Sequence, residues 1–251
     1  MSKKKVSKTY RVIKWVLKLC YPKIGVEGVG NLPEEPTLII GNHSQLHGPI
    51  ACEFYFPIER YTWCAAEMME WKEVPLYAYR DFWSYKPGIS RWLYKILSYL
   101  ITPLSVCIFN NANTIGVYRD TRVFRTFKET LKKLQEGISV IIFPECDREY
   151  NHIVYQFQEG FVDIAKLYYR KTGKELQFVP LYIAPNLKKM YLGKPIRFCA
   201  DNTIEQERER ICNYIMNEIT QMASNLPLHT VVPYRNLPKR QYKKNKVGEE
   251  M

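Results

Sequence analysis

Apolar positions along the chain follow two periods, one typical of buried strands and one typical of helices. Short runs of branched or aromatic residues, bounded by Gly, Pro or polar residues, predict buried strands at 37–41, 139–145 and 177–183. Apolar residues that recur every three or four positions predict amphipathic helices at 121–137, 158–173 and 204–224. Strands that alternate with helices predict an α/β layered fold.

The first 23 residues predict a separate helix that Pro22 ends. Its apolar residues share one side and its basic residues the other, with Val6, Tyr10, Ile13, Leu17 and Cys20 set against Lys4, Lys8, Arg11 and Lys18. Such a helix can lie in the headgroup plane of an anionic membrane, where each basic residue contributes about 1 kcal/mol. A surface helix that packs on its own domain has the same pattern, so both interpretations stay open.

A second apolar stretch, residues 88–109, contains Arg91, Lys95 and Pro103. Its longest part without charge, residues 96–109, is shorter than the roughly 20 residues that a membrane-spanning helix needs. We therefore expect this stretch to be buried in the protein or to dip into one leaflet.

The net charge of +12 is confined to the two ends of the chain. Residues 1–23 carry eight Lys and Arg and no acid, residues 235–251 carry six and two acids, and the remainder is balanced. This distribution indicates attachment to an anionic surface better than a basic nucleic-acid-binding face. We predict three parts: a membrane-surface helix (1–23), one domain (24–230) and a basic C-terminal tail (231–251).

The seven cysteines are scattered, with no Cys-x-x-Cys pair, which favours a reducing cytosolic compartment and predicts neither a zinc site nor a disulfide framework. The sequence also contains no glycine-rich nucleotide-binding loop. We therefore expect no metal or cofactor. Together with the basic ends of the chain, the reducing compartment predicts a protein bound peripherally to the cytoplasmic face of a membrane.

Four polar side chains follow or end predicted strands or short apolar runs. Asn42 and His43 come directly after the strand at 37–41, where α/β sheets usually keep their sites. Arg119 follows a short apolar run and could grip a phosphate with two parallel hydrogen bonds. Glu145 is the last residue of the run predicted as a strand at 139–145 and is presented by Pro144. Taken singly, each also has an ordinary structural interpretation, such as a surface ion pair or a helix-entry charge.

Their order resembles the four sequence blocks of the glycerolipid acyltransferases, the lysophosphatidic-acid and glycerol-phosphate acyltransferase superfamily. The blocks are Asn42-His43, Gly116-Val-Tyr-Arg119, Phe143-Pro-Glu145 and Val179-Pro-Leu181, and the resemblance extends over about residues 24–224. It implies an acyltransferase-like fold with a central mixed, mostly parallel sheet flanked by helices.

The resemblance also implies a reaction. A fatty acyl group would pass from acyl-CoA or acyl carrier protein to the hydroxyl of a lysophospholipid or glycerol-phosphate-like acceptor. His43 would be the general base, Arg119 would bind the acceptor phosphate, and Glu145, with Asn42 and Pro144, would help to hold the acceptor. An ordinary imidazole titrates near neutrality, which suits a base for an alcohol.

Two positions depart from the family pattern. The first block normally continues to an aspartate, where this chain has Gly48, and the third block normally ends in glycine, where it has Cys146. A carboxylate of this kind orients the imidazole, and in serine proteases its loss lowers turnover about 10⁴-fold. If the loop is one residue shorter, His47 takes the aspartate position and could accept a hydrogen bond from His43. Glu67, Glu145 or Asp147 could also reach the ring.

The sequence therefore leaves three functions open. The first is an acyltransferase in phospholipid synthesis. The second is a catalytically weakened or inactive lipid-binding or acyl-binding protein of the same fold, which Gly48 and Cys146 suggest. The third, binding of nucleic acid, rests on net charge alone and is the least favoured, because the body of the chain is neutral.

Overall fold

The computed structural model describes residues 6–84 and 88–246, which form two compact units. The first unit takes in residues 1–22 and 61–129, and the second takes in residues 23–60 and 130–251. Both units are interrupted in sequence, so they cut across the three-part division expected above, which stays a prediction. Lys4 and residues 247–251 of the predicted basic ends lie outside the described residues.

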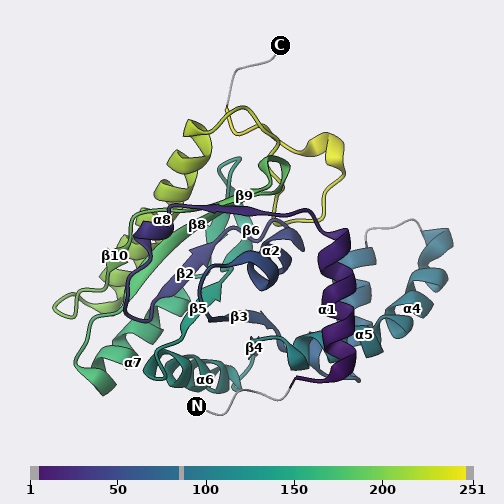
Figure 1. Cartoon of the computed structure of the whole chain (residues 1–251), viewed down its shortest axis with the longest axis horizontal. Helices are drawn as coiled ribbons and strands as arrows, with labels where there is room; N and C mark the ends of the chain where they lie inside the picture. Colours follow the sequence, from purple (N-terminus) through teal and green to yellow (C-terminus); the bar gives the residue numbers. More distant parts are fainter. Residues whose placement is uncertain (1–5, 85–87, 247–251) are drawn as a thin grey trace. The chain divides into compact units, whose positions relative to one another are not determined.

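The second unit is built on a mixed, mostly parallel sheet in the order β1-β9-β8-β2-β5, with β10 pairing β8 (Figure 1). The strands are β1 (Gly25–Glu27), β2 (Leu38–Gly41), β5 (Ser139–Ile142), β8 (Gln177–Ala184), β9 (Lys189–Leu192) and β10 (Ile196–Arg197). The pairs β1–β9, β8–β2 and β2–β5 are parallel. The three strands predicted from apolar runs correspond to β2, β5 and β8, and their residues are almost all buried.

Helices flank this sheet, and a hairpin follows β5. The remaining elements of the second unit are α2 (His47–Tyr55), β6 (Glu145–Tyr150), β7 (Tyr155–Phe157), α7 (Asp163–Thr172) and α8 (Ile204–Asn225). Helices α7 and α8 contact each other, and α8 packs on β8. The predicted strand at 139–145 is therefore shorter than expected, because Glu145 begins the antiparallel pair β6–β7.

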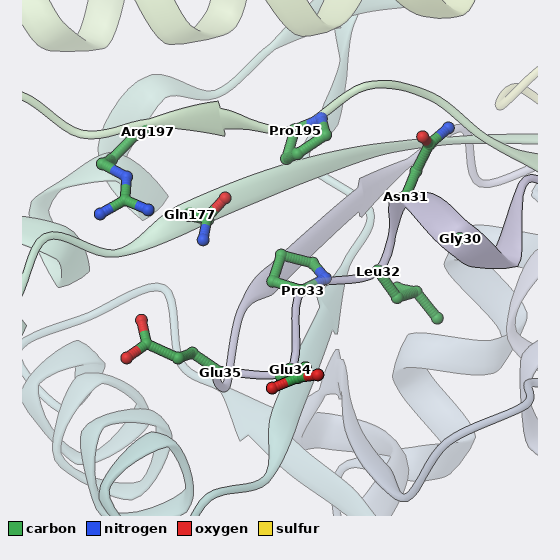
Figure 2. A pocket seen from close by; sticks show the side chains of 9 residues that line it. All are labelled: Gly30, Asn31, Leu32, Pro33, Glu34, Glu35, Gln177, Pro195 and Arg197. Carbon is green, nitrogen blue, oxygen red and sulfur yellow. The ribbon is translucent and has the colours of Figure 1, made fainter.

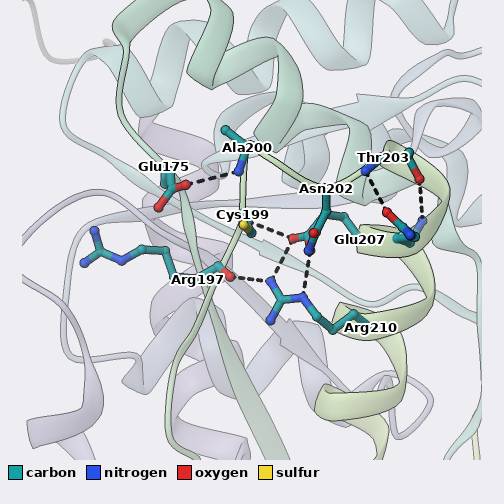
Figure 3. Close-up of polar contacts among 9 residues, drawn as sticks. Glu175, Arg197, Cys199, Ala200, Asn202, Thr203, Glu207 and Arg210 are labelled. Carbon is teal, nitrogen blue, oxygen red and sulfur yellow. Dashed lines mark hydrogen bonds and ion pairs between the residues drawn. The ribbon is translucent and has the colours of Figure 1, made fainter.

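The long helix α8 is fixed at its N-terminus by a buried carboxylate (Figure 3). Thr203 caps the helix and exchanges side-chain to backbone hydrogen bonds with Gln206. Glu207, fully buried, accepts from the Cys199 backbone N–H and pairs with Arg210 over 2.7 Å. These contacts fix the start of α8 at Ile204, the residue at which the sequence predicts the helix to begin.

The first unit combines one parallel pair of strands with mostly short helices. Its elements are α1 (Lys8–Cys20), β3 (Arg60–Ala65), α3 (Val74–Ala78), α4 (Arg91–Leu100), α5 (Thr102–Asn111) and β4 (Thr114–Val117), and it contains the start of α6 (Val123–Gln135). β3 pairs with β4 in register, with Ala65 opposite Val117. α1 is held on α5 by the buried Tyr10 and by a hydrogen bond from the Ser7 N–H to Asn111 Oδ1.

α1 carries a second apolar stripe that the predicted pattern missed. Tyr10, from the predicted stripe, is buried, whereas Val12, Trp15, Val16 and Leu19 are exposed at helical spacing. Trp15 is 64% exposed, a large fraction for an indole. The helix therefore both packs on its own unit and presents an apolar face to solvent.

The stretch 88–109 forms α4 and α5. Of the two alternatives expected for it, burial in the protein is wrong for α4, and a dip into one leaflet stays a prediction. Trp92, Ile96, Tyr99 and Leu100 are all exposed. Among the described residues, no single helix has the length and hydropathy of a membrane span. The pair 88–100 and 102–111 meets that test jointly, with a bend of 42° between its halves.

Candidate active site

The candidate site lies where parallel strands β2 and β5 end. β2 passes into Asn42 and His43, and β5 passes into Phe143, Pro144 and Glu145. Because the carboxyl ends of parallel strands meet at one edge of a sheet, these two segments come together although about a hundred residues separate them. The His43 backbone N–H donates to Glu145 Oε2 over 2.6 Å.

Asn42 fixes the turn that follows β2. Its side-chain oxygen accepts from the Ile183 N–H over 2.7 Å, and its Nδ2 donates to the Ile183 carbonyl and to Ser44 Oγ. The side chain is buried, and its amide hydrogens are donated within the protein. Asn42 therefore positions the turn, and this geometry gives no support to the predicted contact between Asn42 and substrate.

The turn after His43 is too tight for a side chain at position 48. Ser44 and Gln45 have φ values of 46° and 55°, in the left-handed region that L residues seldom adopt. The Gly48 N–H then donates to the His43 carbonyl over 3.1 Å. A Cβ at position 48 would lie 2.5 Å from that carbonyl oxygen. Glycine is therefore required here, and the missing aspartate follows from the backbone path.

The His43 imidazole lies between two aromatic rings. Its ring centroid is 5.3 Å from that of Phe143 and 5.7 Å from that of Tyr234, both in edge-to-face geometry. Within residues 6–84 and 88–246, the buried Nδ1 atom has no hydrogen-bond partner of standard geometry. No carboxylate or imidazole therefore orients the ring through this atom.

His47 does not supply the missing partner at Nδ1. Its backbone N–H donates to the Ser44 carbonyl over 3.1 Å, and the residue begins α2. Burial, with a contribution from the charge of Lys239, lowers the pKa of His47. The hydrogen bond predicted between the two histidines is therefore wrong for the Nδ1 atom of His43, and a catalytic role for His47 has no geometric support.

Burial also determines the protonation of His43. It lowers the pKa of His43 to about 4, and the Gln45 backbone, which acts in the opposite direction, is the weaker influence. The imidazole is therefore neutral at pH 7 and can accept a proton. The imidazolium that results would lack the stabilisation that a neighbouring carboxylate gives in a triad.

Glu145 binds backbone N–H groups and not the His43 imidazole. Its two carboxylate oxygens accept from the backbone N–H groups of His43 and Tyr155, the second over 2.9 Å. Burial raises the pKa of Glu145 to about 7, although both N–H groups favour the charged form. Glu145 thus joins the turn after β2 to the β6–β7 hairpin. Asp147, another expected partner of the ring, instead pairs with Arg235 over 3.2 Å.

The rest of the third block fixes the same hairpin. The Pro144 carbonyl accepts from the Gln158 N–H over 2.8 Å, and Cys146 Sγ donates to the Gln156 carbonyl. Cys146 therefore has a structural contact of its own at the position where the family has glycine. The Pro144 carbonyl thus ties the residue before Glu145 to the end of β7. The predicted role of Pro144 in holding the acceptor stays a prediction.

Arg119 belongs to the first unit, and its surroundings are those of that unit. β3 and β4 are parallel and in register, so Glu67 and Arg119, each two residues beyond its strand, occupy equivalent positions. Charges on both act on Asp81, whose pKa burial raises and Arg119 lowers. The Oε2 atom of Glu67 is buried without a hydrogen-bond partner among the described residues. Arg119 therefore lies in a neighbourhood that also contains carboxylates.

Sequence reasoning missed the aromatic residues around His43. Phe143 opens the third block, but the sequence predicts no role for its ring, and Tyr155 follows in the hairpin. Tyr234 lies in a segment predicted as a basic tail, and it also contacts Tyr155 at 6.1 Å between ring centroids. The Tyr-bearing run at 231–234 is apolar, which is the one signal that this segment folds back.

A surface cavity lies at the end of the sheet opposite to His43. Its volume is about 420 Å³, and residues 30–35, Gln177, Pro195 and Arg197 line it (Figure 2). Gln177 begins β8 and residues 30–35 precede β2, so this cavity is at the amino ends of the strands. Among the described residues, no group of three His, Cys, Asp or Glu side chains could hold a metal ion.

Comparisons with known proteins give a likeness in structure but none in sequence. No protein family matches the chain, and no curated protein matches it in sequence. The crystal structure of the 1-acyl-sn-glycerophosphate (LPA) acyltransferase PlsC from Thermotoga maritima resembles it with a TM-score of 0.51, over 87% of this chain and 81% of that one. The two sequences are 16% identical. The likeness confirms the predicted α/β fold, with a mixed, mostly parallel sheet flanked by helices.

Proposed function

We propose that this protein is an acyltransferase that moves a fatty acyl group from acyl-CoA or acyl carrier protein to the hydroxyl of a lysophospholipid or glycerol-phosphate-like acceptor. The observation that carries the proposal is the position of His43. A neutral imidazole follows a central strand at the carboxyl edge of a sheet whose fold resembles that of an LPA acyltransferase.

In this proposal His43 removes the proton of the acceptor hydroxyl as the oxygen attacks the thioester carbonyl. The tetrahedral intermediate then expels the donor thiolate, which takes the proton from His43 as it leaves. Backbone N–H groups of the turn at 44–46 would stabilise the oxyanion. Glu145 contributes by holding the His43 backbone, and Arg119 is proposed to bind the acceptor phosphate because of the block in which it stands.

We also propose that the first unit binds the cytoplasmic face of an anionic membrane. The exposed stripe of α1 is apolar, and Arg11 and Lys18 lie at helical spacing along one side of it. A lipid surface with anionic headgroups matches both the apolar and the basic part of this face. α4 supports the same partner, because Trp92, 65% exposed, carries an indole of the kind that favours the headgroup level.

The experiment is an assay with purified protein, labelled acyl-CoA or acyl carrier protein, and a panel of lysophospholipids and glycerol phosphate. Transfer of label to one class of acceptor supports the proposal and names the acceptor. Absence of transfer with every donor and acceptor, from protein that is folded and bound to vesicles, would contradict it.

A second candidate is a lipid-binding or acyl-binding protein of the same fold with weak or no turnover. The observation that favours it is that Nδ1 of His43 has no hydrogen-bond partner in the part of the chain that the structure describes, together with the lowered pKa of that ring. Saturable binding of acyl-CoA or lysophospholipid without transfer of label would support this candidate over the first.

A further inference from the structure

The segment after α8 folds back on the second unit and is closed into a loop by one buried asparagine. The Asn245 side chain accepts from the His229 N–H over 2.8 Å and donates to the Ala223 carbonyl over 2.7 Å. Its backbone N–H donates to the His229 carbonyl, and the Val231 N–H donates to the Lys243 carbonyl. Because Asn245 is fully buried, the base of this loop is anchored, although sequence alone suggested a tail.

The tip of the loop reaches the turn that carries His43. Gln45 Nε2 donates to the Arg235 carbonyl over 3.2 Å and to the Tyr242 hydroxyl over 2.7 Å. Arg235 also pairs with Asp147 on β6. The loop is therefore tied both to the turn after β2 and to the hairpin after β5.

Tyr234 is the loop residue that contacts the imidazole. Its ring is 5.7 Å from His43 with an interplanar angle of 81°, and Tyr155 supports it from the hairpin. Phe143 contacts the imidazole in the same edge-to-face manner, at 74°. Two rings from different elements thus restrict the imidazole where the hydrogen bond to a carboxylate is missing.

We infer that Tyr234 is a positioning residue for His43, and that the C-terminal loop takes over the orienting role of the carboxylate that Gly48 excludes. The contact holds the ring but provides no negative charge, so it positions the neutral base without stabilising the imidazolium. The effect on catalysis rests on the proposed function, whereas the effect on the ring does not.

Titratable groups lie on each of the elements that carry or contact His43. They are Glu145 and Asp147 of β6, Tyr155 of β7, His47 at the start of α2, and Tyr234, Arg235 and Lys239 of the loop. A change in the His43 titration must therefore be compared with a variant that keeps the aromatic ring and all of these charges.

The test uses the full chain with ¹⁵N-labelled histidine and follows His43 by NMR as pH changes. Tyr234→Ala is expected to open the ring to solvent, so that the pKa of His43 rises from about 4 toward its usual 6.5. Tyr234→Phe keeps the ring contact and is expected to leave this pKa unchanged. Tyr214→Ala is the matched control, since Tyr214 lies on α8 and bonds the Lys194 carbonyl instead.

In the transfer assay, Tyr234→Ala is expected to lower kcat on the order of ten- to a hundredfold while KM changes little, and Tyr234→Phe is expected to restore the rate. The inference is overturned if folded Tyr234→Ala keeps the wild-type titration of His43. A wild-type protein without transfer activity would contradict the proposed function alone, because the titration still tests the contact.

Discussion

The path of the backbone requires glycine at position 48, where the family pattern has a catalytic aspartate. A Cβ there would press on the His43 carbonyl oxygen, and such overpacking costs about 1–3 kcal/mol. We predict that Gly48→Ala lowers the free energy of unfolding by this amount, measured by denaturant titration. Gly160→Ala is the control, because the space around Gly160 is open.

The same contact predicts that Gly48→Asp does not raise the rate of acyl transfer. The carboxylate can enter only if the turn moves, and the turn carries the base. A large gain in rate from a folded Gly48→Asp protein would show that the backbone adapts, and would contradict this account of position 48.

The contribution of Glu145 to the free energy of unfolding depends on pH. Burial raises the pKa of Glu145 from 4.5 to about 7, so between these values the folded state holds a proton that the unfolded state releases. The contribution of Glu145 to stability therefore falls as pH rises through this window, by about 3 kcal/mol in full. His43, whose pKa is lowered, acts in the opposite direction.

We predict that the difference in unfolding free energy between wild type and Glu145→Gln decreases from pH 4.5 to pH 7. Chemical denaturation at a series of pH values measures it, and the subtraction removes the contribution of His43. Glu209→Gln makes the same substitution at an exposed position and is the matched control. A flat difference for Glu145→Gln would mean that this carboxyl is not desolvated as described.

The sequence alone predicted that His43 and Glu145 lie at the ends of strands, but it did not predict the contacts that their side chains make. The sequence placed both after strands, and parallel pairing brings them together. It did not indicate that Glu145 binds the His43 backbone, because the partner is an N–H group that every residue carries. It also missed Tyr234, since contact with His43 depends on where the chain turns after α8.

At the scale of elements, the buried strands were predictable because both faces of β2, β5 and β8 are covered and their sequences are continuously apolar. The hairpin β6–β7 was not, since β6 is rich in exposed charged residues and has no apolar period. The apolar stripe predicted for α1 contains the buried Tyr10, but its later members Leu17 and Cys20 are exposed. The second stripe escaped notice because a single apolar stripe already satisfied the pattern.

The exposed stripe of α1 predicts how binding to membranes depends on sequence and on charge. We expect flotation with vesicles that contain anionic lipid, and less with neutral vesicles or at high salt, because the basic residues beside the stripe are screened. Replacing Val12, Trp15 and Leu19 together with Ser is expected to weaken binding at least tenfold.

Phe124→Ser is the matched control for that experiment, since Phe124 is an exposed aromatic residue of the same unit on α6 rather than on the stripe. Vesicle binding that survives in the triple variant would exclude α1 as the membrane-binding face. Equal binding to neutral and anionic vesicles would remove the electrostatic part of the proposal.

At the scale of the whole molecule, the charge pattern and the fold were predictable, whereas the division into two units was not. The distribution of charge along the chain can be counted from the residues without knowledge of the structure. The compact units each combine segments far apart in sequence, and only tertiary contacts define them. The C-terminal segment shows the same limit, because its basic composition indicated a tail although Asn245 anchors it.

The central claim is that His43 is the base of an acyl transfer. Its most direct test compares initial rates of transfer for wild type and His43→Ala, with His152→Asn as control because Asn tolerates the left-handed φ of 66° at that position. We predict a loss on the order of 10²- to 10⁴-fold for His43→Ala and no loss for the control. Equal rates for wild type and a folded His43→Ala protein would contradict the account.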